Sequence, residues 1–484
     1  MPLYRIERGE HRLLASSFER VRGQAHEQFA PVIAPVQTPA RRVGQQTITL
    51  RPESGPDKLE PELTYNGAAR GNQGDRKGRE EEMTDETRLR QMPLGGVRVL
   101  DLGRHLAGPT CAMLLGDLGA DVIKIEKPEV GEDGRASGPP FFQGVSAFFL
   151  SANRNKRSLT LDIKRPEGQE AFRRLANTAD VVIENFRPGV SDALGIGYTV
   201  MHERNPRIIY CAISGFGADG PFADRPGLDQ IIQGVSGLMG VTGFEGGDPV
   251  RVGIPIADLL TGLYGAYGVL AALQARERTG QGQMVNTSLL ECMVGTMGFQ
   301  AVRYLNGAGV PPPAGNHHPI NAPYGVFRAK DGYLTLGATG EKRWTQFCQL
   351  LDAPEWRDDP RFNTNGGRHE HRLVLAELIS EKLQARTVDD WERLFNEAGI
   401  PAGPVYPVDR ALAHPQVRHR EMVVEREHPV MGTVSLLGLP VKFSETPGDI
   451  HRIPPSLGEH TDEILREIGY GDDDLSQMRE ERIV

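Results

Sequence analysis

A strand–helix–strand pattern in residues 94–127, LGGVRVLDLGRHLAGPTCAMLLGDLGADVIKIEK, limits the folds that are open to this chain. Residues 97–102 are a short apolar run of the kind found in buried parallel strands. Pro109 suits the first turn of a following helix, and Gly119 suits its C-terminal stop. Residues 122–125 form a second apolar run. Two such strands joined by a helix predict an α/β layer built on a parallel sheet.

The same alternation continues along the chain. We expect strands at 158–164, 180–186 and 207–217, a helix at 166–179, a glycine-rich and partly helical stretch at 226–243, and a helix from Asp258 to about Ala275. The turn after the first strand, GRHLAGP, does not match GxGxxG. The sequence therefore lacks the dinucleotide fingerprint that often accompanies a parallel sheet of this type.

A Pro-, Gly- and His-rich segment, residues 307–320, marks a domain boundary. After it, residues 324–338 predict a hairpin that turns on Lys330, Asp331 and Gly332. Amphipathic helices then alternate with loops to about Gly399. Residues 430–443 predict strands, and residues 457–470 predict a final helix capped by Thr461 or Asp462.

Residues 1–92 differ in composition from the rest of the chain. They are rich in Pro, Gly, Gln, Arg and Glu and have no sustained hydrophobic period. Such a segment buries too little apolar surface to offset the entropy of ordering, so we expect it to be disordered. We also hypothesise that translation naturally starts at Met83, because the preceding GREEE is what a purine-rich ribosome-binding site would encode.

The net charge limits the classes of binding partner, and the cysteine content indicates the redox state of the compartment. The formal net charge is −9, so the overall charge attracts neither nucleic acid nor an anionic membrane. No uninterrupted apolar run reaches the roughly 18 residues of a membrane span. The four cysteines lie far apart without a CxxC pair, which predicts buried thiols in a reducing cytoplasm; they are Cys111, Cys211, Cys292 and Cys348.

Several familiar chemistries lack their motifs. The sequence contains no HExxH, GxSxG or GxxxxGK[ST]. His317 and His318 are adjacent but have no matching carboxylate cluster, so we expect a solvated loop and no metal site. Basic residues do gather around the first strands, where they either form an ordinary solvated surface or converge on a phosphorylated ligand; they are Arg104, Lys124, Lys127, Arg135, Arg154, Lys156, Arg157, Lys164 and Arg187.

One carboxylate stands out by its position. Asp258 ends the apolar run Gly253-Ile254-Pro255-Ile256-Ala257, just where a small-residue helix begins. An Asp at this position suits an N-cap, whose side chain accepts a hydrogen bond from the first helical turn. The same position also suits a nucleophile, because a helix N-terminus favours the ionised form. The local pattern leaves both readings open.

From Leu94 to the C-terminal helix, the chain resembles the class III CoA-transferases, the formyl-CoA transferase and CaiB/BaiF family. The resemblance rests on residues 97–128, on NRNKRSLTLDIK, NFRPG and PGLDQIIQGVSGLMGVTG, on GIPIADLLTGLYG around Asp258, and on GNHHPINAPYGVF and LGEHTDEIL, which occur in the family's order. It implies a Rossmann-like parallel-sheet domain over residues 93–300, a linker at 301–318 and a smaller α+β domain at 319–405. Residues 406–484 then return to the large domain, and two chains form an interlocked homodimer.

The resemblance also implies a reaction. Asp258 falls at the family's catalytic aspartate, which attacks an acyl-CoA to form an aspartyl anhydride and then an aspartyl–CoA thioester, from which an acid acceptor takes CoA. CoA and acyl-CoA are substrates, and no tightly bound cofactor is implied. Asp229 matches a position near the acyl pocket. Positions near CoA match Lys127, Arg135, Leu161, Lys164, Asn185, Phe186 and Arg187, of which Arg187 best suits a CoA phosphate.

Departures from the family pattern keep other functions open. Ala193 stands where many members have Arg, and Leu106 stands where formyl-CoA transferases have Gln, which argues against oxalate specificity. Acyl-CoA racemases share the implied fold but use a His where this chain has Leu228, so a two-base racemase would lack one partner. A CoA-binding paralogue without catalysis is the non-enzymatic alternative.

Overall fold

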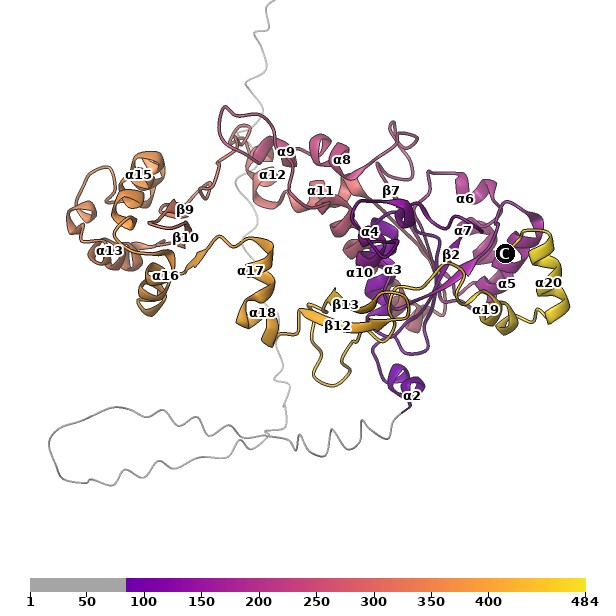
Figure 1. Cartoon of the computed structure of the whole chain (residues 1–484). Helices are drawn as coiled ribbons and strands as arrows, with labels where there is room; N and C mark the ends of the chain where they lie inside the picture. Colours follow the sequence, from indigo (N-terminus) through magenta and orange to yellow (C-terminus); the bar gives the residue numbers. More distant parts are fainter. Residues whose placement is uncertain (1–83) are drawn as a thin grey trace, which may run out of the picture. The chain divides into compact units, whose positions relative to one another are not determined.

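The computed structural model describes residues 84–484 (Figure 1). The expectation of disorder for residues 1–83, and the hypothesis of a start at Met83, lie outside the described residues. Residues 84–92 differ from the expectation, because helix α2 (Asp85–Arg90) forms there and Met92 is buried. The α2 helix begins at a cap in which Thr84 accepts a hydrogen bond from the backbone N–H of Thr87.

A six-stranded parallel sheet forms the centre of the large domain. Its strand order is β5-β2-β1-β6-β7-β8, and every neighbouring pair is parallel. The strands are β1 (Arg98–Asp101), β2 (Asp121–Glu126), β5 (Lys156–Thr160), β6 (Val181–Glu184), β7 (Ile209–Ser214) and β8 (Met284–Ser288). This topology confirms the predicted α/β class.

Both faces of the sheet are covered, which explains the consecutive apolar residues in its inner strands β1, β2, β6 and β7. Val99 of β1 belongs to the core on one face, and the next residue, Leu100, belongs to the core on the other. The first face is covered by α3 (Ala107–Gly116), α8 (Asp229–Val235), α10 (Ile256–Thr279) and α11 (Leu289–Thr296). The second is covered by α5 (Pro166–Thr178) and α7 (Tyr198–Arg204).

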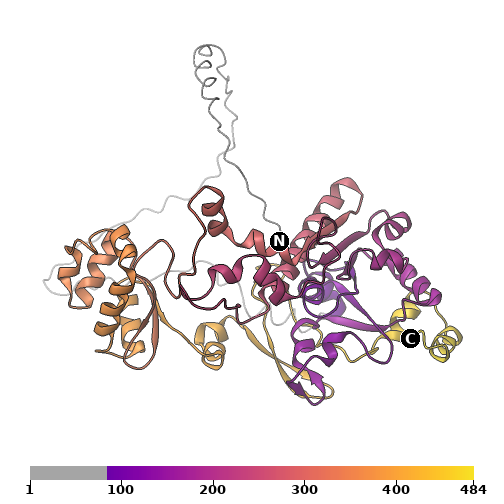
Figure 2. The ribbon, with the colours of Figure 1, turned by 90° about the horizontal axis from the view of Figure 1, so that it is seen from above.

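The last residues of the chain complete this second face. Helices α19 (Thr461–Glu467) and α20 (Asp472–Glu480) place Ile464 and Leu475 in the core with Phe172 of α5, as Figure 2 shows by the yellow segment beside the sheet. Arg157 of β5 joins α19 to the sheet through ion pairs to Glu463 and Glu467. The sequence predicted a single final helix capped by Thr461 or Asp462, whereas the structure has two helices and the first is preceded by His460.

A second, separate core lies between residues 324 and 404. Antiparallel strands β9 (Tyr324–Arg328), β10 (Tyr333–Gly337) and β11 (Ala402–Pro404) form a sheet in the order β11-β10-β9. Helices α13 (Glu341–Leu350), α14 (Asn365–Glu370), α15 (Arg372–Leu383) and α16 (Val388–Glu397) surround a core that includes Trp344, Phe347 and Phe395. The hairpin expected at residues 324–338 is the β9–β10 pair.

Shorter elements complete the chain. They are η1 (Asp133–Ala136), β3 (Phe141–Phe142), β4 (Val145–Ser146), α4 (Ala147–Ala152), α6 (Val190–Ala193), α9 (Leu238–Val241), α12 (Gly298–Leu305), η2 (Pro354–Arg357), α17 (Val408–Ala413), α18 (Pro415–His419), β12 (Val423–His428) and β13 (Gly432–Leu437). All four cysteines are free and buried, as the sequence predicts.

Helix α10 is long and carries Asp258 in its first turn. Among residues 84–484 it is the one helix that is long and apolar enough, by length and composition, to cross a membrane, and 39% of its apolar window is buried within the structure. It packs closely on α3, because a Cβ added to Gly262 would lie only 2.9 Å from the carbonyl oxygen of Ala107. Glycine at this position lets the two helices approach each other.

Candidate active site

The carboxyl ends of the parallel strands open onto two adjoining cavities. In parallel α/β sheets this edge is where ligands bind. The larger cavity, about 440 Å³, is lined by residues that follow β1, β6, β7 and β8 and by Asp229 and Asp258. The smaller, about 170 Å³, is lined by residues that follow β1, β2, β5 and β6. Both cavities share Arg104, Phe186 and Val190, so they form two parts of one trough.

Asp258 occupies the third position of α10, inside the first helical turn. The residue before the helix is Pro255, which has no side-chain capping bond. The N-cap reading of Asp258 is therefore wrong, because its side chain lies one turn too far into the helix. Among the described residues, no hydrogen-bond or ion-pair partner contacts the Asp258 carboxylate, which lines the larger cavity.

Asp229, the first residue of α8, supplies the missing cap from 29 residues away in the chain. Its Oδ1 accepts hydrogen bonds from the backbone N–H groups of Ala257 at 2.8 Å and Asp258 at 3.3 Å. Its Oδ2 accepts a hydrogen bond of 2.6 Å from Nε2 of Gln233. Both oxygens of Asp229 are thus engaged, whereas those of Asp258 remain available to a ligand.

The surroundings of Asp258 affect its charge. Burial, and secondarily the negative charge of Asp229, raises the pKa of Asp258 to about 7. The sequence argument, that a helix N-terminus favours the ionised form, considers only one of the effects present. Here the desolvation of Asp258 and its repulsion by Asp229 exceed that effect and favour the protonated form.

Four cationic or titratable basic side chains line the larger cavity: Arg104, His105, Arg187 and Arg225. Arg104 pairs with Asp133, and the His105 ring lies 3.5 Å from the same carboxylate. Arg225 lies over the ring of Phe222, with 3.8 Å between the guanidinium carbon and the ring centroid. Within residues 84–484, neither Arg187 nor Arg225 has an acidic partner.

The smaller cavity contains Lys127, Leu161 and Lys164 and shares Phe186 with the larger one. Leu161 is buried and contributes an apolar wall. Lys164 is exposed and has no acidic partner in the described part of the chain, whereas Lys127 lies 4.0 Å from Asp133. Exposed cations beside an apolar wall suit a ligand that carries phosphates on an organic body.

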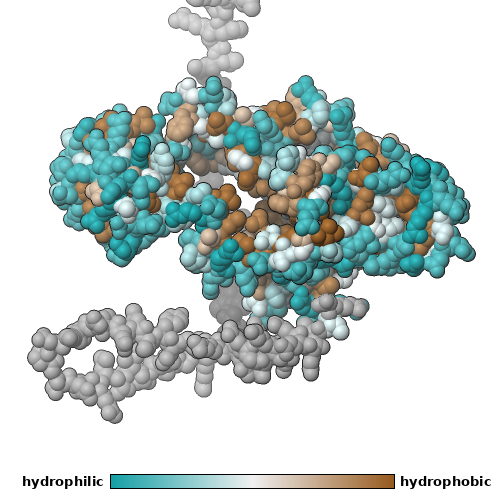
Figure 3. All heavy atoms as spheres, viewed as in Figure 1, coloured by the Kyte–Doolittle hydropathy of each residue, from teal (hydrophilic) through white to brown (hydrophobic). Residues whose placement is uncertain are grey.

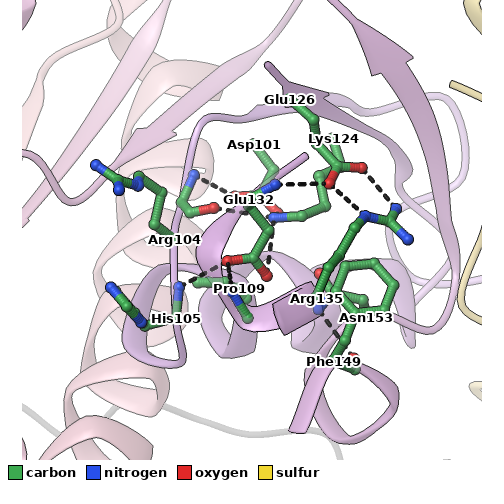
Figure 4. Close-up of polar contacts among 12 residues, drawn as sticks. Asp101, Arg104, His105, Pro109, Lys124, Glu126, Glu132, Arg135, Phe149 and Asn153 are labelled. Carbon is green, nitrogen blue, oxygen red and sulfur yellow. Dashed lines mark hydrogen bonds and ion pairs between the residues drawn. The ribbon is translucent and has the colours of Figure 1, made fainter. Parts of the chain in front are cut away.

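Side chains from three elements hold the backbone of the turn after β1. The backbone N–H of Gly103 donates to Asp101, and its carbonyl accepts from the ammonium of Lys124. Asn185 both accepts from the N–H of Arg104 and donates to its carbonyl, each at 2.8 Å. The side chains of Arg104 and His105 point away from this buried network (Figure 4).

Asn185 lines the larger cavity, but its side-chain amide already forms hydrogen bonds with the backbone of Arg104. Its role within the described structure is to fix the turn that presents Arg104 and His105. Glu132 helps, because its Oε2 accepts a hydrogen bond from the backbone N–H of His105, whose φ of 61° is unusual for a residue other than glycine. The wall between the two cavities is thus preorganised.

Most of the other basic residues do not converge on the cavities. Lys124 and Lys156 are completely buried near Asp101, with the Lys156 ammonium 2.8 Å from its carboxylate. Arg154 pairs with Asp117 and Arg157 with Asp121, so these residues stabilise the fold. Figure 4 shows Arg135 turned toward Glu126, which it contacts at 2.6 and 2.7 Å. Arg135 lines neither cavity, in contrast to the other residues matched to the CoA site.

Sequence reasoning missed Gln233 and Arg225. Gln233 lies four residues after Asp229, one helical turn away, which was the available signal for their contact. No group of three or more His, Cys, Asp or Glu side chains within residues 84–484 is placed to hold a metal ion. His318 instead stacks on Tyr324, with 4.9 Å between ring centroids.

Comparison with known proteins gives a consistent result. The profile of CoA-transferase family III matches residues 94–461. The chain is 42% identical over 381 residues to succinyl-CoA:glutarate CoA-transferase of Homo sapiens, covering 79% of this chain and 87% of the relative. It is 38% identical to succinate–glutarate CoA-transferase of Agrobacterium fabrum, covering 78% of this chain and 96% of the relative. A crystal structure of a CAIB/BAIF family protein from Brucella suis superimposes with a TM-score of 0.71 at 40% identity, covering 78% of this chain and 99% of that one.

Proposed function

Since the chain belongs to CoA-transferase family III, we propose that it transfers CoA from succinyl-CoA to a dicarboxylic acid through covalent intermediates on Asp258. Members of the family are enzymes that transfer CoA between an acyl-CoA and a carboxylic acid, and this chain is one of them. The donor, the acceptor and the role of Asp258 are the proposed part.

One observation carries the assignment of Asp258. Of the described residues that line the larger cavity, only Asp229 and Asp258 bear carboxylates. Asp229 uses both oxygens in hydrogen bonds, and Asp258 uses neither. A half-buried carboxylate without partners destabilises the folded protein, and such a group is typically retained where function requires it. Asp258 is therefore the carboxylate that is free to react.

The proposed reaction needs only acyl transfers. An Asp258 oxygen attacks the thioester carbonyl of the donor, the C–S bond breaks, and CoA leaves as the thiolate. The thiolate then attacks the Asp258 carbonyl of the anhydride, releasing the donor acid and forming an aspartyl–CoA thioester. The acceptor carboxylate attacks this thioester, and the thiolate released attacks the acceptor's carbonyl in the new anhydride. This last step yields the product acyl-CoA and restores the Asp258 carboxylate.

The trough contains side chains that suit the phosphates of CoA and others that suit its organic part. Arg187 and Lys164 are exposed cations without acidic partners among the described residues, and Lys127 lies in the same cavity as Lys164. A guanidinium can bind a phosphate through two parallel hydrogen bonds. We assign these three residues to the phosphates of CoA and the apolar wall at Leu161 to its organic part.

The acceptor class follows from the relatives and from Arg225. The relatives described above are named for succinyl and glutarate transfer, and a further one, from Chloroflexus aurantiacus, is named succinyl-CoA–D-citramalate CoA-transferase. All of these acids carry a second carboxylate. Arg225 lines the same cavity as Asp258 and has no acidic partner in the described chain, so it can bind that second carboxylate.

We also propose that the enzyme is a homodimer. Helices α8, α10, α11 and α12 expose large hydrophobic side chains, which are Ile231, Val235, Leu263, Tyr264, Tyr267, Leu270, Val294, Phe299, Val302, Tyr304 and Leu305. Figure 3 shows hydrophobic residues, in brown, among hydrophilic ones on the face that it displays. Exposed apolar surface on this scale is typical of a protein interface. A solution mass of one chain, measured by light scattering, would exclude the dimer.

The direct test is an assay with succinyl-CoA and glutarate, in which the formation of glutaryl-CoA is followed by chromatography. Asp258→Asn should abolish turnover while leaving CoA binding intact. An acyl-CoA racemase would instead incorporate deuterium at the α-carbon of a branched acyl-CoA in heavy water without an acceptor acid. Tight CoA binding without turnover of either kind would favour the non-catalytic paralogue.

A further inference from the structure

We propose that Gln233 is a positioning residue that acts through Asp229 to hold Asp258 in the orientation needed for attack. The inference rests on the proposed function, in that it takes Asp258 as the nucleophile. Gln233 does not line either cavity and touches no reacting atom. Its effect on the reaction must therefore be transmitted through the residues that it holds.

Gln233 is completely buried, and its side-chain amide is fully used. Its Nε2 donates to Oδ2 of Asp229 at 2.6 Å and to the carbonyl of Ile254 at 3.5 Å. Its Oε1 accepts from the backbone N–H of Val252 at 2.9 Å. One side chain thus ties α8 to the segment that enters α10. A buried amide in such a network cannot be replaced by an apolar group without leaving polar partners unsatisfied.

Asp229 passes this constraint to the nucleophile. The first N–H groups of a helix have no partner within the helix, and Pro255 offers no side chain to cap α10. Asp229 fills this role through its bonds to the N–H groups of Ala257 and Asp258. Because Gln233 holds the second oxygen of the same carboxylate, rotation of Asp229 would break the cap. The backbone of Asp258 is therefore fixed by a side chain that Gln233 fixes in turn.

The same arrangement sets the electrostatic surroundings of Asp258. The charged and titratable groups that share its cavity are Arg104, His105, Arg187, Arg225 and Asp229. Only Asp229 contributes to the raised pKa of Asp258, besides burial. A movement of Asp229 would therefore change both the orientation of the nucleophile and the pH at which it ionises.

The test compares Gln233→Leu and Gln233→Glu with Gln349→Leu, which changes an exposed glutamine on α13. In Gln233→Leu we expect kcat to fall by about 10- to 100-fold with little change in KM for succinyl-CoA, since misplaced reacting groups slow chemistry more than binding. Gln349→Leu should match the wild type. Thermal unfolding of each variant shows that the protein assayed is folded.

Gln233→Glu distinguishes a role of Gln233 in positioning Asp258 from a role that only stabilises the fold. A protonated Glu can still donate to Asp229 and accept from Val252, whereas an ionised Glu repels Asp229. We therefore expect this variant to retain activity at low pH and to lose it as pH rises, which adds a descending limb to the pH profile. A folded Gln233→Leu with a kcat within twofold of the wild type, or a Gln233→Glu profile identical in shape to the wild type, would overturn the proposal.

Asp229→Asn provides a second test, which addresses the charge of Asp229. It keeps an oxygen for the cap but loses the charge and the acceptor for Nε2 of Gln233, so the apparent pKa of the Asp258 limb should fall below about 7. An unchanged limb would contradict the statement that Asp229 sets the pH at which Asp258 ionises. Asp258→Asn tests the proposed function independently of the Gln233 variants. If Asp258→Asn still transfers CoA, Asp258 is not the nucleophile.

Discussion

Asp229 accepts hydrogen bonds from the backbone N–H groups of Ala257 and Asp258, so one acidic residue caps the helix that carries another. Burial, together with the negative charge that this cap brings close to Asp258, raises the pKa of that carboxyl to about 7. A higher pKa makes a carboxylate more nucleophilic once it is ionised. The raised pKa therefore lowers the fraction of Asp258 side chains that are ionised and makes each ionised carboxylate a stronger nucleophile.

The first prediction concerns the pH dependence of activity. Only the ionised form of Asp258 can attack, so kcat/KM should rise with pH and level off above an apparent pKa of about 7. The measurement is kcat/KM for succinyl-CoA from pH 5 to 9 at constant ionic strength. A flat profile across that range would mean that Asp258 does not limit the reaction through its ionisation.

The second prediction concerns stability. The folded pKa of Asp258 is raised from an ordinary value of 3.8 to about 7, so between these values the native state keeps a proton that the unfolded state has released. Stability therefore falls as pH rises through this window, and the whole deficit is present above pH 7. Asp258→Asn removes the deficit and should raise the free energy of unfolding at pH 8 by about 1–3 kcal/mol. Urea unfolding should show no such gain at pH 4.

The third prediction concerns the CoA phosphates. Arg187→Ala and Lys164→Ala should each raise KM for succinyl-CoA by about tenfold, because each removes a charge-assisted contact, and should leave kcat nearly unchanged. The increase should shrink at high salt, where such contacts are screened. Arg393→Ala, which changes an exposed arginine on α16, is the matched control. An effect of equal size in the control would show that only the overall charge matters.

The fourth prediction concerns the acceptor. Arg225→Leu should raise KM for glutarate by about 10-fold or more, because the second carboxylate loses its cationic partner. Butyrate, which has no second carboxylate, should be affected little. Arg225→Lys should recover part of the loss, since it restores the charge without the planar guanidinium. Equal losses for both acids would indicate that Arg225 supports the cavity without recognising the substrate.

The fifth prediction concerns the turn after β1. Asn185→Leu deprives both the N–H and the carbonyl of Arg104 of their partners and should cost about 1–3 kcal/mol of unfolding free energy. Activity should fall as well, because the turn presents Arg104 to both cavities and His105 to the larger one. Denaturant unfolding and initial rates check the two effects. A stable, fully active variant would contradict the positioning role of Asn185.

The sequence predicted the parallel sheet because inner strands such as β1 carry consecutive apolar residues, and Val99 and Leu100 enter cores on opposite faces of the sheet. It also led to Asp258 through the resemblance to a family. It did not predict the cap from Asp229, because that contact depends on how α8 lies against α10 rather than on neighbouring residues. Long-range contacts of this kind leave no local pattern in one sequence.

The basic residues illustrate a second limit. Lys124 lies among the apolar residues of β2, and Lys156 begins the more polar strand β5. The local sequence does not show whether either lysine is solvated or forms a buried ion pair. Their partner, Asp101, lies on a neighbouring part of the sheet and is itself fully buried. Arg135 was matched to the CoA site by position alone, whereas its guanidinium is engaged by Glu126. Pairing across strands decides these cases, and pairing follows only from the fold.

The most direct test of the central claim is the mass of the tryptic peptide that contains Asp258, residues 252–276, after the enzyme is incubated with succinyl-CoA and treated with hydroxylamine. Hydroxylamine converts an activated carboxyl, whether anhydride or thioester, into a hydroxamate. We predict the hydroxamate mass on this peptide, at Asp258, and its absence both without succinyl-CoA and in Asp258→Asn. An unmodified peptide from an enzyme that is turning over would contradict covalent catalysis by Asp258.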